Sequence, residues 1–115
     1  MKEPGSATIE DFDRLDIHVG RILEAATLEG ARRPAYRLAI DFGPGGTRQS
    51  SAQLVATYPD PAVLVGRLVV AVVNFAPRRV AGFRSDVLVL GALPDDGSIP
   101  LLSVDAGASP GDRIG

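Results

Sequence analysis

The sequence predicts an all-β fold with small helical additions, built as one barrel of five strands. Three observations lead to this prediction. The chain has 115 residues, the size of a single domain with one core, so residues 1–115 are assigned to one domain. Apolar residues recur with the period of two that is typical of strands, or in short continuous runs. Clusters of glycine and proline separate these segments, as turns do.

A short helix is expected near the N-terminus. Thr8 is followed three residues later by Asp11, the spacing of a capping box, in which each side chain accepts the other residue's backbone N–H. Ile9 and Phe12 then fall on one side of the helix. Residues 1–16 are therefore interpreted as a helical extension with a packing role.

The first strand is expected to begin at Ile17. Residues 17–25 alternate apolar and polar side chains and then change phase around Gly20. A glycine inside a strand often marks a bulge or a sharp bend. A long first strand that bends at a glycine is what closure of a small barrel requires.

A hairpin follows a turn at residues 30–34. Residues 36–42 alternate between apolar side chains and polar or small ones, which predicts a strand with one buried face. The glycine-rich residues 43–46 are typical of a hairpin connection. A third strand is then expected over residues 47–50.

A helix is expected between the third and fourth strands. Ser51 can cap a helix over residues 52–58, which Pro59 would end. Asp60 and the proline after it are typical of an N-cap and a first helical position, so one further turn is expected before Gly66.

The last strands complete the fold. Residues 68–73 are continuously apolar, which predicts a strand that is covered on both faces. A loop or hairpin over residues 74–85, a strand over residues 86–90 and a short final strand over residues 101–104 follow, and residues 92–115 form a C-terminal extension. Five core strands with a helix between the third and fourth indicate an OB-fold, a five-stranded Greek-key barrel.

Charge is distributed unevenly along the chain. The formal net charge is −2, which argues against a broadly basic nucleic-acid-binding or membrane-surface protein. Residues 17–86 nevertheless hold nine arginines and five acidic residues, a sum of +4, whereas residues 1–16 and 87–115 each sum to −3. The middle of the chain is therefore basic and its ends are acidic. The plainer interpretation is that these charges only solubilise different faces.

Composition excludes several kinds of active site. There is no cysteine and one histidine, His18, so no disulfide, thiol nucleophile or clustered metal site is expected. Ser50 and Ser51 lack the glycine-flanked turn of a hydrolase nucleophile. Residues 43–46 lack the lysine and hydroxyl of a phosphate-binding loop. We therefore expect no enzyme activity, no metal and no cofactor.

Targeting signals are not apparent in the sequence. The first residues lack the apolar segment of a leader. The longest apolar run, residues 68–73, is far shorter than the roughly 20 residues that cross a bilayer. A cytoplasmic location without membrane insertion is expected.

The segment over residues 74–85 is the strongest candidate for a binding site. It follows a buried strand, so it should be held at a defined rim of the barrel. Its arginines can bind phosphate or carboxylate through paired N–H groups, and its two phenylalanines can stack on unpaired bases. The alternative is that the phenylalanines belong to the core and the arginines merely surround them. The candidate residues are Asn74, Phe75, Arg78, Arg79, Phe83, Arg84 and Ser85.

Four blocks of sequence resemble the tRNA-binding domain family. They are residues 15–22, 49–53, 72–85 and 87–91, and they stand in the order and at the spacing of that family. The resemblance covers nearly the whole chain. It implies an OB-fold that works as a homodimer and binds tRNA or another structured RNA. It assigns the contact to the arginine loop together with two polar residues after the third strand. The implied RNA-binding residues are Ser51, Gln53, Asn74, Arg78, Arg79, Arg84 and Ser85.

Two other functions stay open from the sequence. One branch of the resembling family consists of secretion-related chaperones, which implies binding of unfolded or export-bound polypeptides, with Phe75, Phe83 and Arg79 as contacts. The apolar surplus of residues 68–73 and 87–90 supports this alternative, because a dimer could share it. The chain could also be only a subunit that dimerises within another complex. The acidic ends predict a dimer interface at the N-terminal helix and the C-terminal strand.

Overall fold

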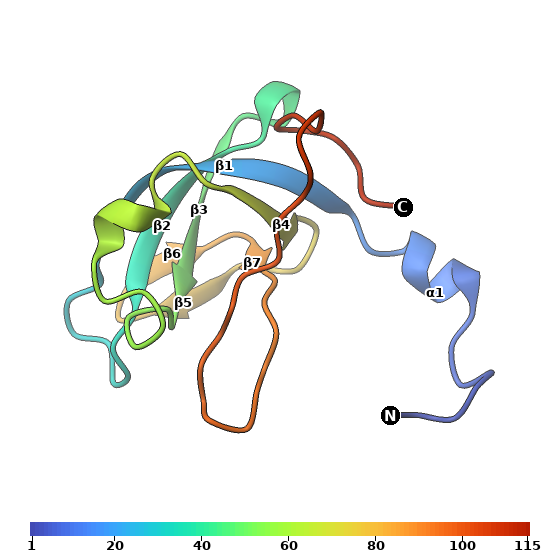
Figure 1. The fold of residues 1–115 in the computed structure, drawn as a ribbon, viewed down its shortest axis with the longest axis horizontal. Helices are drawn as coiled ribbons and strands as arrows, with labels where there is room; N and C mark the ends of the chain where they lie inside the picture. The colour runs from blue at the N-terminus through green and yellow to red at the C-terminus, as the bar shows by residue number, and fades with distance from the viewer.

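The computed structural model describes residues 1–115 and shows a five-stranded antiparallel β-barrel (Figure 1). The strands lie in the order β3-β2-β1-β4-β7. Their bounds are β1 Ile17–Thr27, β2 Tyr36–Asp41, β3 Thr47–Ala52, β4 Leu68–Val72 and β7 Leu88–Val89. Three short helices accompany them, namely α1 Ile9–Asp13, η1 Gly43–Gly45 and η2 Pro61–Leu64. This order confirms the predicted OB-fold.

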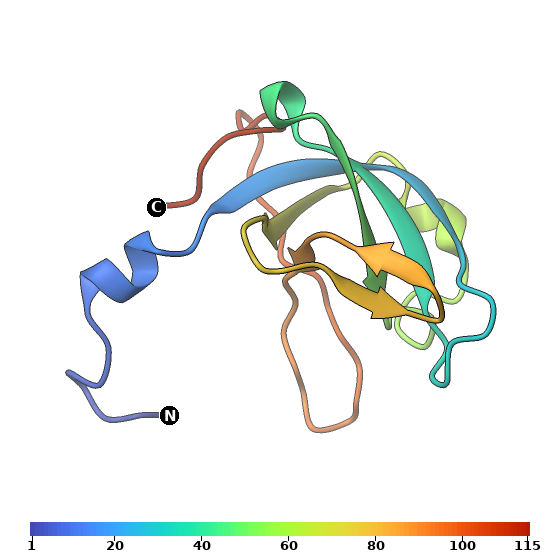
Figure 2. The ribbon, with the colours of Figure 1, turned by 180° about the vertical axis from the view of Figure 1, so that it is seen from behind.

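A separate hairpin lies within the connection from β4 to β7. Its strands are β5 Arg78–Val80 and β6 Phe83–Ser85, which pair with each other and with no barrel strand. Figure 2 shows this hairpin in front of the barrel, beside β3. The barrel is nearly closed next to it: β3 and β7 are not paired, but the Ser50 hydroxyl of β3 donates to the Val87 carbonyl just before β7 at 3.0 Å.

The long strand β1 serves both halves of the barrel. Residues 17–21 pair with β4, whereas the later residues pair with β2. A bulge or a sharp bend was expected at Gly20, and the register shift lies two residues later, between Ile22 and Glu24. Gly20 also makes room for core side chains, because a Cβ there would lie 2.5 Å from the Ile40 Cγ2 atom and 2.8 Å from the Phe42 ring. A larger residue at this position would collide with both side chains.

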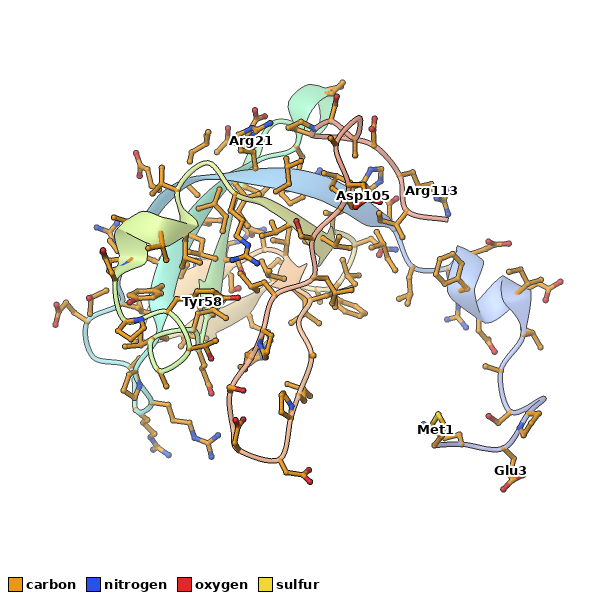
Figure 3. All side chains as sticks on the ribbon, in the orientation of Figure 1. Met1, Glu3, Arg21, Tyr58, Asp105 and Arg113 are labelled. Carbon is orange, nitrogen blue, oxygen red and sulfur yellow. The ribbon has the colours of Figure 1, made fainter.

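The N-terminal helix stands away from the barrel (Figure 1). The predicted capping box is present, with the Thr8 hydroxyl accepting from the Asp11 backbone and the Asp11 carboxylate accepting from the Thr8 backbone. None of the residues of α1 is buried. Figure 3 shows Met1 and Glu3 beyond α1, far from the side chains of the barrel. No helix of the structure has the length and apolar character needed to cross a bilayer.

The helix predicted over residues 52–58 does not form. β3 continues to Ala52, and the following residues make turns before η2 begins. One turn is left, in which the Tyr58 N–H donates to the Leu54 carbonyl at 2.8 Å. Two side chains of this segment bind the chain after β7: the Thr57 hydroxyl accepts from the Ile99 N–H at 2.8 Å, and the Tyr58 hydroxyl accepts from the Leu101 N–H at 3.1 Å. The predicted later turn is present as η2, where the Asp60 carboxylate accepts from the Ala62 N–H.

The prediction of a final strand over residues 101–104 is also wrong. Only one bridge is found there, between Leu101 and Gly91, and Ser103 turns its hydroxyl to the Leu68 carbonyl at 3.2 Å. The chain then runs on to residues 109–114, which we call the C-terminal strap. The strap lies against the start of β1, since the Val19 N–H donates to the Asp112 carbonyl at 2.8 Å.

The core occupies the inside of the barrel, and a smaller apolar cluster lies outside it. The inner cluster includes Ile22, Tyr36, Leu38, Ile40, Phe42, Leu54, Leu64, Val69, Ala71, Val87 and Leu101. The outer cluster is formed by Ile17, Val70 and Val72, with Phe12, Leu15, Leu90, Val104 and Ile114 packed against it. β4 is therefore covered on both faces, as its continuous apolar run predicted.

Candidate nucleic-acid interface

A wide groove of about 790 Å³ lies between the β1–β2 loop, the end of β3, the β5–β6 hairpin and the connection after β7. Its floor is apolar and includes Leu54, Leu88, Leu90, Leu93, Ile99 and Leu101. Four arginines stand at its rim, two from each side, and they are Arg32, Arg33, Arg78 and Arg79. In OB-folds, the face of the second and third strands and the loops beside it are the surface that binds ligands.

The β5–β6 hairpin presents its arginines in a fixed arrangement. Arg79 lies directly opposite Arg84 across the two strands, and Arg78 lies opposite Ser85. Two like charges at directly opposite positions destabilise a strand pair. Asp86 offsets part of this repulsion through its ion pair with Arg84, which leaves Arg79 as the charge that an anionic ligand would neutralise. The turn between the strands requires left-handed backbone, with φ of 51° at Ala81 and 79° at Gly82.

Hydrogen bonds to β3 hold the hairpin in place. The Ser51 N–H donates to the Ser85 hydroxyl at 3.0 Å, and the side-chain amide of Gln49 donates to the Arg84 carbonyl at 2.8 Å. The Asp86 N–H donates to the Gln49 carbonyl at 2.9 Å. The hairpin is thus attached to the rigid barrel at three points, which lowers the entropy lost when it binds a ligand.

The rim of the groove carries unneutralised positive charge. Only two ion pairs occur in the structure, His18 with Asp16 and Arg84 with Asp86. None of the four rim arginines is paired with a carboxylate, and Arg79 donates only to the Gly82 carbonyl, at 3.1 Å. Guanidinium groups above an apolar floor attract phosphates more strongly than isolated charges in open water do.

The remaining predicted residues divide between the groove and structural contacts. Ser51 and Gln53 line the groove. Ser85 is buried and acts as the acceptor for β3. Asn74 accepts from the Asp16 N–H at 2.8 Å and donates to the Arg14 carbonyl at 2.8 Å, so it joins the N-terminal extension to the loop after β4.

The two predicted aromatic residues differ in exposure and in their neighbours. Phe83 is half-buried and pairs across the hairpin with Val80. Phe75 is 46% exposed and lies outside the main groove, beside Arg84. It therefore does not belong to the core, which was one of the alternatives that the sequence left open.

Sequence reasoning missed Arg32 and Arg33 as candidate contacts. Both lie in the β1–β2 connection, which the sequence showed only as a turn, and the fold brings them to the groove across from the hairpin. Their adjacency in the sequence, followed by Pro34, is the signal that could have found them, because a proline-stiffened loop with paired arginines suits anion binding.

The groups that could support catalysis are scattered. The Ser50 hydroxyl donates to the Val87 carbonyl, whereas the His18 ring contacts Asp16 and the Gly111 carbonyl. No three histidine, cysteine, aspartate or glutamate side chains gather as a metal site would need. The hydroxyl and backbone N–H of Ser98 lower the pKa of Asp96, which is exposed in the loop after β7.

Comparisons with known proteins agree with this geometry. The family model described as "Putative tRNA binding domain" matches residues 17–113. A methionine–tRNA ligase of Neisseria meningitidis serogroup A is 42% identical over 110 residues, which is 95% of this chain and 16% of the ligase. The chain thus spans about a sixth of the length of the curated relatives it matches.

Two solved structures match this chain over almost the full length of both proteins. The crystal structure of the chaperone CsaA from Bacillus anthracis is 47% identical, has a TM-score of 0.90, and covers 96% of this chain and 100% of its own. The CsaA chaperone protein from Picrophilus torridus is 44% identical, has a TM-score of 0.86, and covers 95% of this chain and 99% of its own.

Proposed function

This chain belongs to the tRNA-binding domain family, and we propose that it binds tRNA or another structured RNA, as a homodimer and without catalysing a reaction. The proposal extends to a protein of the CsaA type, since two such proteins match nearly end to end. A cytoplasmic location suits a partner that is a tRNA.

The observation that carries the proposal is the ring of unpaired arginines around the groove. Arg32 and Arg33 come from one loop, Arg78 and Arg79 from the hairpin opposite, and the space between them holds about 790 Å³. Phosphate contacts supply most of the sequence-independent affinity for nucleic acids. The groove concentrates the basic charge of the middle of the chain in one place, so a net charge of −2 does not prevent local binding.

A titration of labelled tRNA at several salt concentrations tests the proposal. Each phosphate contact contributes a slope of about −0.7 to −0.9 to the plot of log affinity against log salt. Four contacts therefore give a slope of about −3 to −4, and replacing Arg78 and Arg79 by glutamine removes about two units of it. Absence of binding at low salt, or a slope near zero, contradicts the proposal.

A matched control needs an arginine away from the groove. Arg37 lies on β2 opposite the groove-lining Ser51, so its loss should also reduce tRNA binding. Arg113, which is exposed in the C-terminal strap and lines neither hollow, is the distant control. The Arg113→Gln variant removes one positive charge from the same protein and is expected to change the slope by much less than one unit. If it weakens tRNA binding as much as Arg78→Gln does, the groove has no special role.

We place the interface of the proposed homodimer at the two ends of the chain. α1 projects from the barrel, its Ile9 side chain is 67% exposed, and the outer apolar cluster lies beside the point from which it leaves. A second copy would cover these apolar groups. Light scattering should give twice the mass of one chain, and deletion of residues 1–14 should shift the equilibrium to monomer. A fully dimeric truncated protein refutes the part assigned to the helix.

A second candidate function is binding of unfolded or export-bound polypeptides. The apolar floor of the groove favours it, with Leu93 80% exposed and Leu88 46% exposed. Such an exposed apolar surface is typical of sites for apolar partners. Binding of an unstructured apolar peptide with little salt dependence, and its displacement by tRNA, would show that both ligands use the groove. Failure to bind peptide or to suppress aggregation of an unfolded substrate rejects this function.

A further inference from the structure

A second, smaller hollow lies at the open end of the β5–β6 hairpin. It has a volume of about 380 Å³. Its walls come from β3, from the loop after β4 and from the end of β6, and they are formed by Arg48, Val73, Phe75, Pro77, Arg84 and Asp86. None of the four arginines at the rim of the main groove lines it. The hairpin therefore contributes residues to two separate hollows.

The small hollow combines an apolar wall with fixed polar groups. Phe75 is 46% exposed and shares the wall with Pro77. Arg48 is held across the hollow, since its Nη1 group donates to the Val73 carbonyl at 3.2 Å. The Arg84 Nε–H donates to the Asp86 Oδ1 atom at 2.7 Å. That contact fixes the carboxylate, and the Oδ2 atom of Asp86 has no hydrogen-bond partner.

We infer that this hollow takes one unpaired nucleobase of a bound RNA, and that the base is guanine. The inference rests on the proposed RNA-binding function and adds a base preference to it. An aromatic side chain at an open wall suits stacking of an extruded base. Guanine is the base that presents two adjacent N–H donors on its Watson–Crick edge, and a carboxylate accepts both. Asp86 supplies that carboxylate beside Phe75.

Charge argues against a cationic peptide side chain as the occupant. Lysine or arginine would also pack on Phe75 and approach Asp86, but Asp86 is already neutralised by Arg84, and Arg48 adds a further positive charge to the hollow. The net charge of these walls is positive, so a cation is repelled. A neutral base attached to an anionic phosphate meets the carboxylate and the arginines together.

The opposed arginines of the hairpin connect the two hollows. Arg79 lines the main groove, Arg84 lines the small hollow, and the two are paired directly across β5 and β6, so their side chains share one face of the hairpin. A phosphate bound on this face would contact both guanidinium groups. The nucleotide that follows this phosphate is then placed at Phe75.

The test uses the parent protein and uridine-rich RNA 11-mers that differ only at the central base. Guanine at that position is expected to bind about tenfold more tightly than adenine, since a bidentate base contact discriminates by about 1–3 kcal/mol. Inosine, which lacks the exocyclic amino group, should fall between them. Equal affinity for guanine, adenine and inosine overturns the inference, and so does tighter binding of a lysine-containing peptide that displaces the guanine RNA from the hollow.

Variants locate the preference at the hollow. Asp86→Asn should remove the advantage of guanine over adenine while both still bind, and Phe75→Leu should weaken binding of all bases about five- to tenfold. Asp95→Asn, an exposed carboxylate in another loop, should leave the preference unchanged. A preference for guanine that survives Asp86→Asn also overturns the inference. Salt-dependent tRNA binding without any base preference would leave the proposed function standing, whereas no RNA binding at all would remove both.

Discussion

Replacement of Ser85 by alanine tests the view that this buried hydroxyl positions the hairpin instead of touching RNA. Its Oγ atom accepts the Ser51 N–H at 3.0 Å, and the residue is only 9% exposed. Without it, a half-buried N–H loses its partner. Leaving such a donor unsatisfied costs about 1–3 kcal/mol of the free energy of unfolding.

Urea unfolding measures this cost directly. The chain has two tyrosines and no tryptophan, so circular dichroism is the suitable signal. With an m-value of about 1.5 kcal/mol per molar urea, a loss of about 2 kcal/mol lowers the midpoint by about 1 M. The melting temperature should fall by about 4 °C for each kcal/mol. Affinity for tRNA should fall in parallel, because the hairpin is no longer held to β3.

Ser103 supplies the control. Its exposed hydroxyl donates to the Leu68 carbonyl at 3.2 Å, and Ser103→Ala should change stability by less than about 0.5 kcal/mol. If Ser85→Ala leaves the urea midpoint at the parent value while tRNA affinity falls, Ser85 contacts RNA directly and the reasoning is refuted.

Three further outcomes are expected. Ala81→Asn should raise the free energy of unfolding by about 0.5–1 kcal/mol, since φ is 51° there and asparagine tolerates left-handed backbone better than alanine; an unchanged melting temperature contradicts this. Gly43→Ala should destabilise by about 2 kcal/mol or more, because φ is 61° and a Cβ would lie 2.5 Å from the Pro110 carbonyl oxygen, and hydrogen exchange in the C-terminal strap should accelerate. Ser98→Ala should raise the pKa of Asp96 towards its ordinary value, as an NMR titration would show. The lowered pKa makes the folded state gain stability above the ordinary carboxyl pKa and lose it as pH falls through the lowered value. The variant should show less of this dependence, because the backbone N–H of residue 98 still donates to Asp96.

Local patterns in the sequence predicted the elements whose causes are local. The capping box at Thr8, the alternating strand β2 and the glycine-rich turn after it are all present. The helix expected over residues 52–58 did not form: β3 continues to Ala52, which pairs with Tyr36 of β2, and the Thr57 and Tyr58 side chains bind the backbone 42 and 43 residues later. Long-range contacts of this kind leave no periodic trace in the sequence.

In the candidate site, too, the features with local causes could be predicted from the sequence and those that depend on long-range contacts could not. The arginine hairpin could be found because its residues are close together in the sequence, whereas the partner arginines Arg32 and Arg33 reach the groove only through the closure of the barrel. Asn74 and Ser85 are predicted as RNA contacts on the strength of their motif. Both also hydrogen-bond the backbone, at Arg14 and Ser51, so the motif contains residues that hold the loop in place, a role that the sequence pattern did not indicate.

The C-terminal strap bears on how the chain is synthesised. The His18 ring contacts the Gly111 carbonyl, 93 residues further along the chain. The strap also hydrogen-bonds both the N–H and the carbonyl of Val19. A nascent chain that has reached residue 108 already holds every barrel strand but leaves this side of β1 unpaired. An open strand edge is a template for pairing with other chains. The strap therefore ends a period in which newly made copies are prone to aggregate, and chains that stop before it should accumulate as insoluble protein.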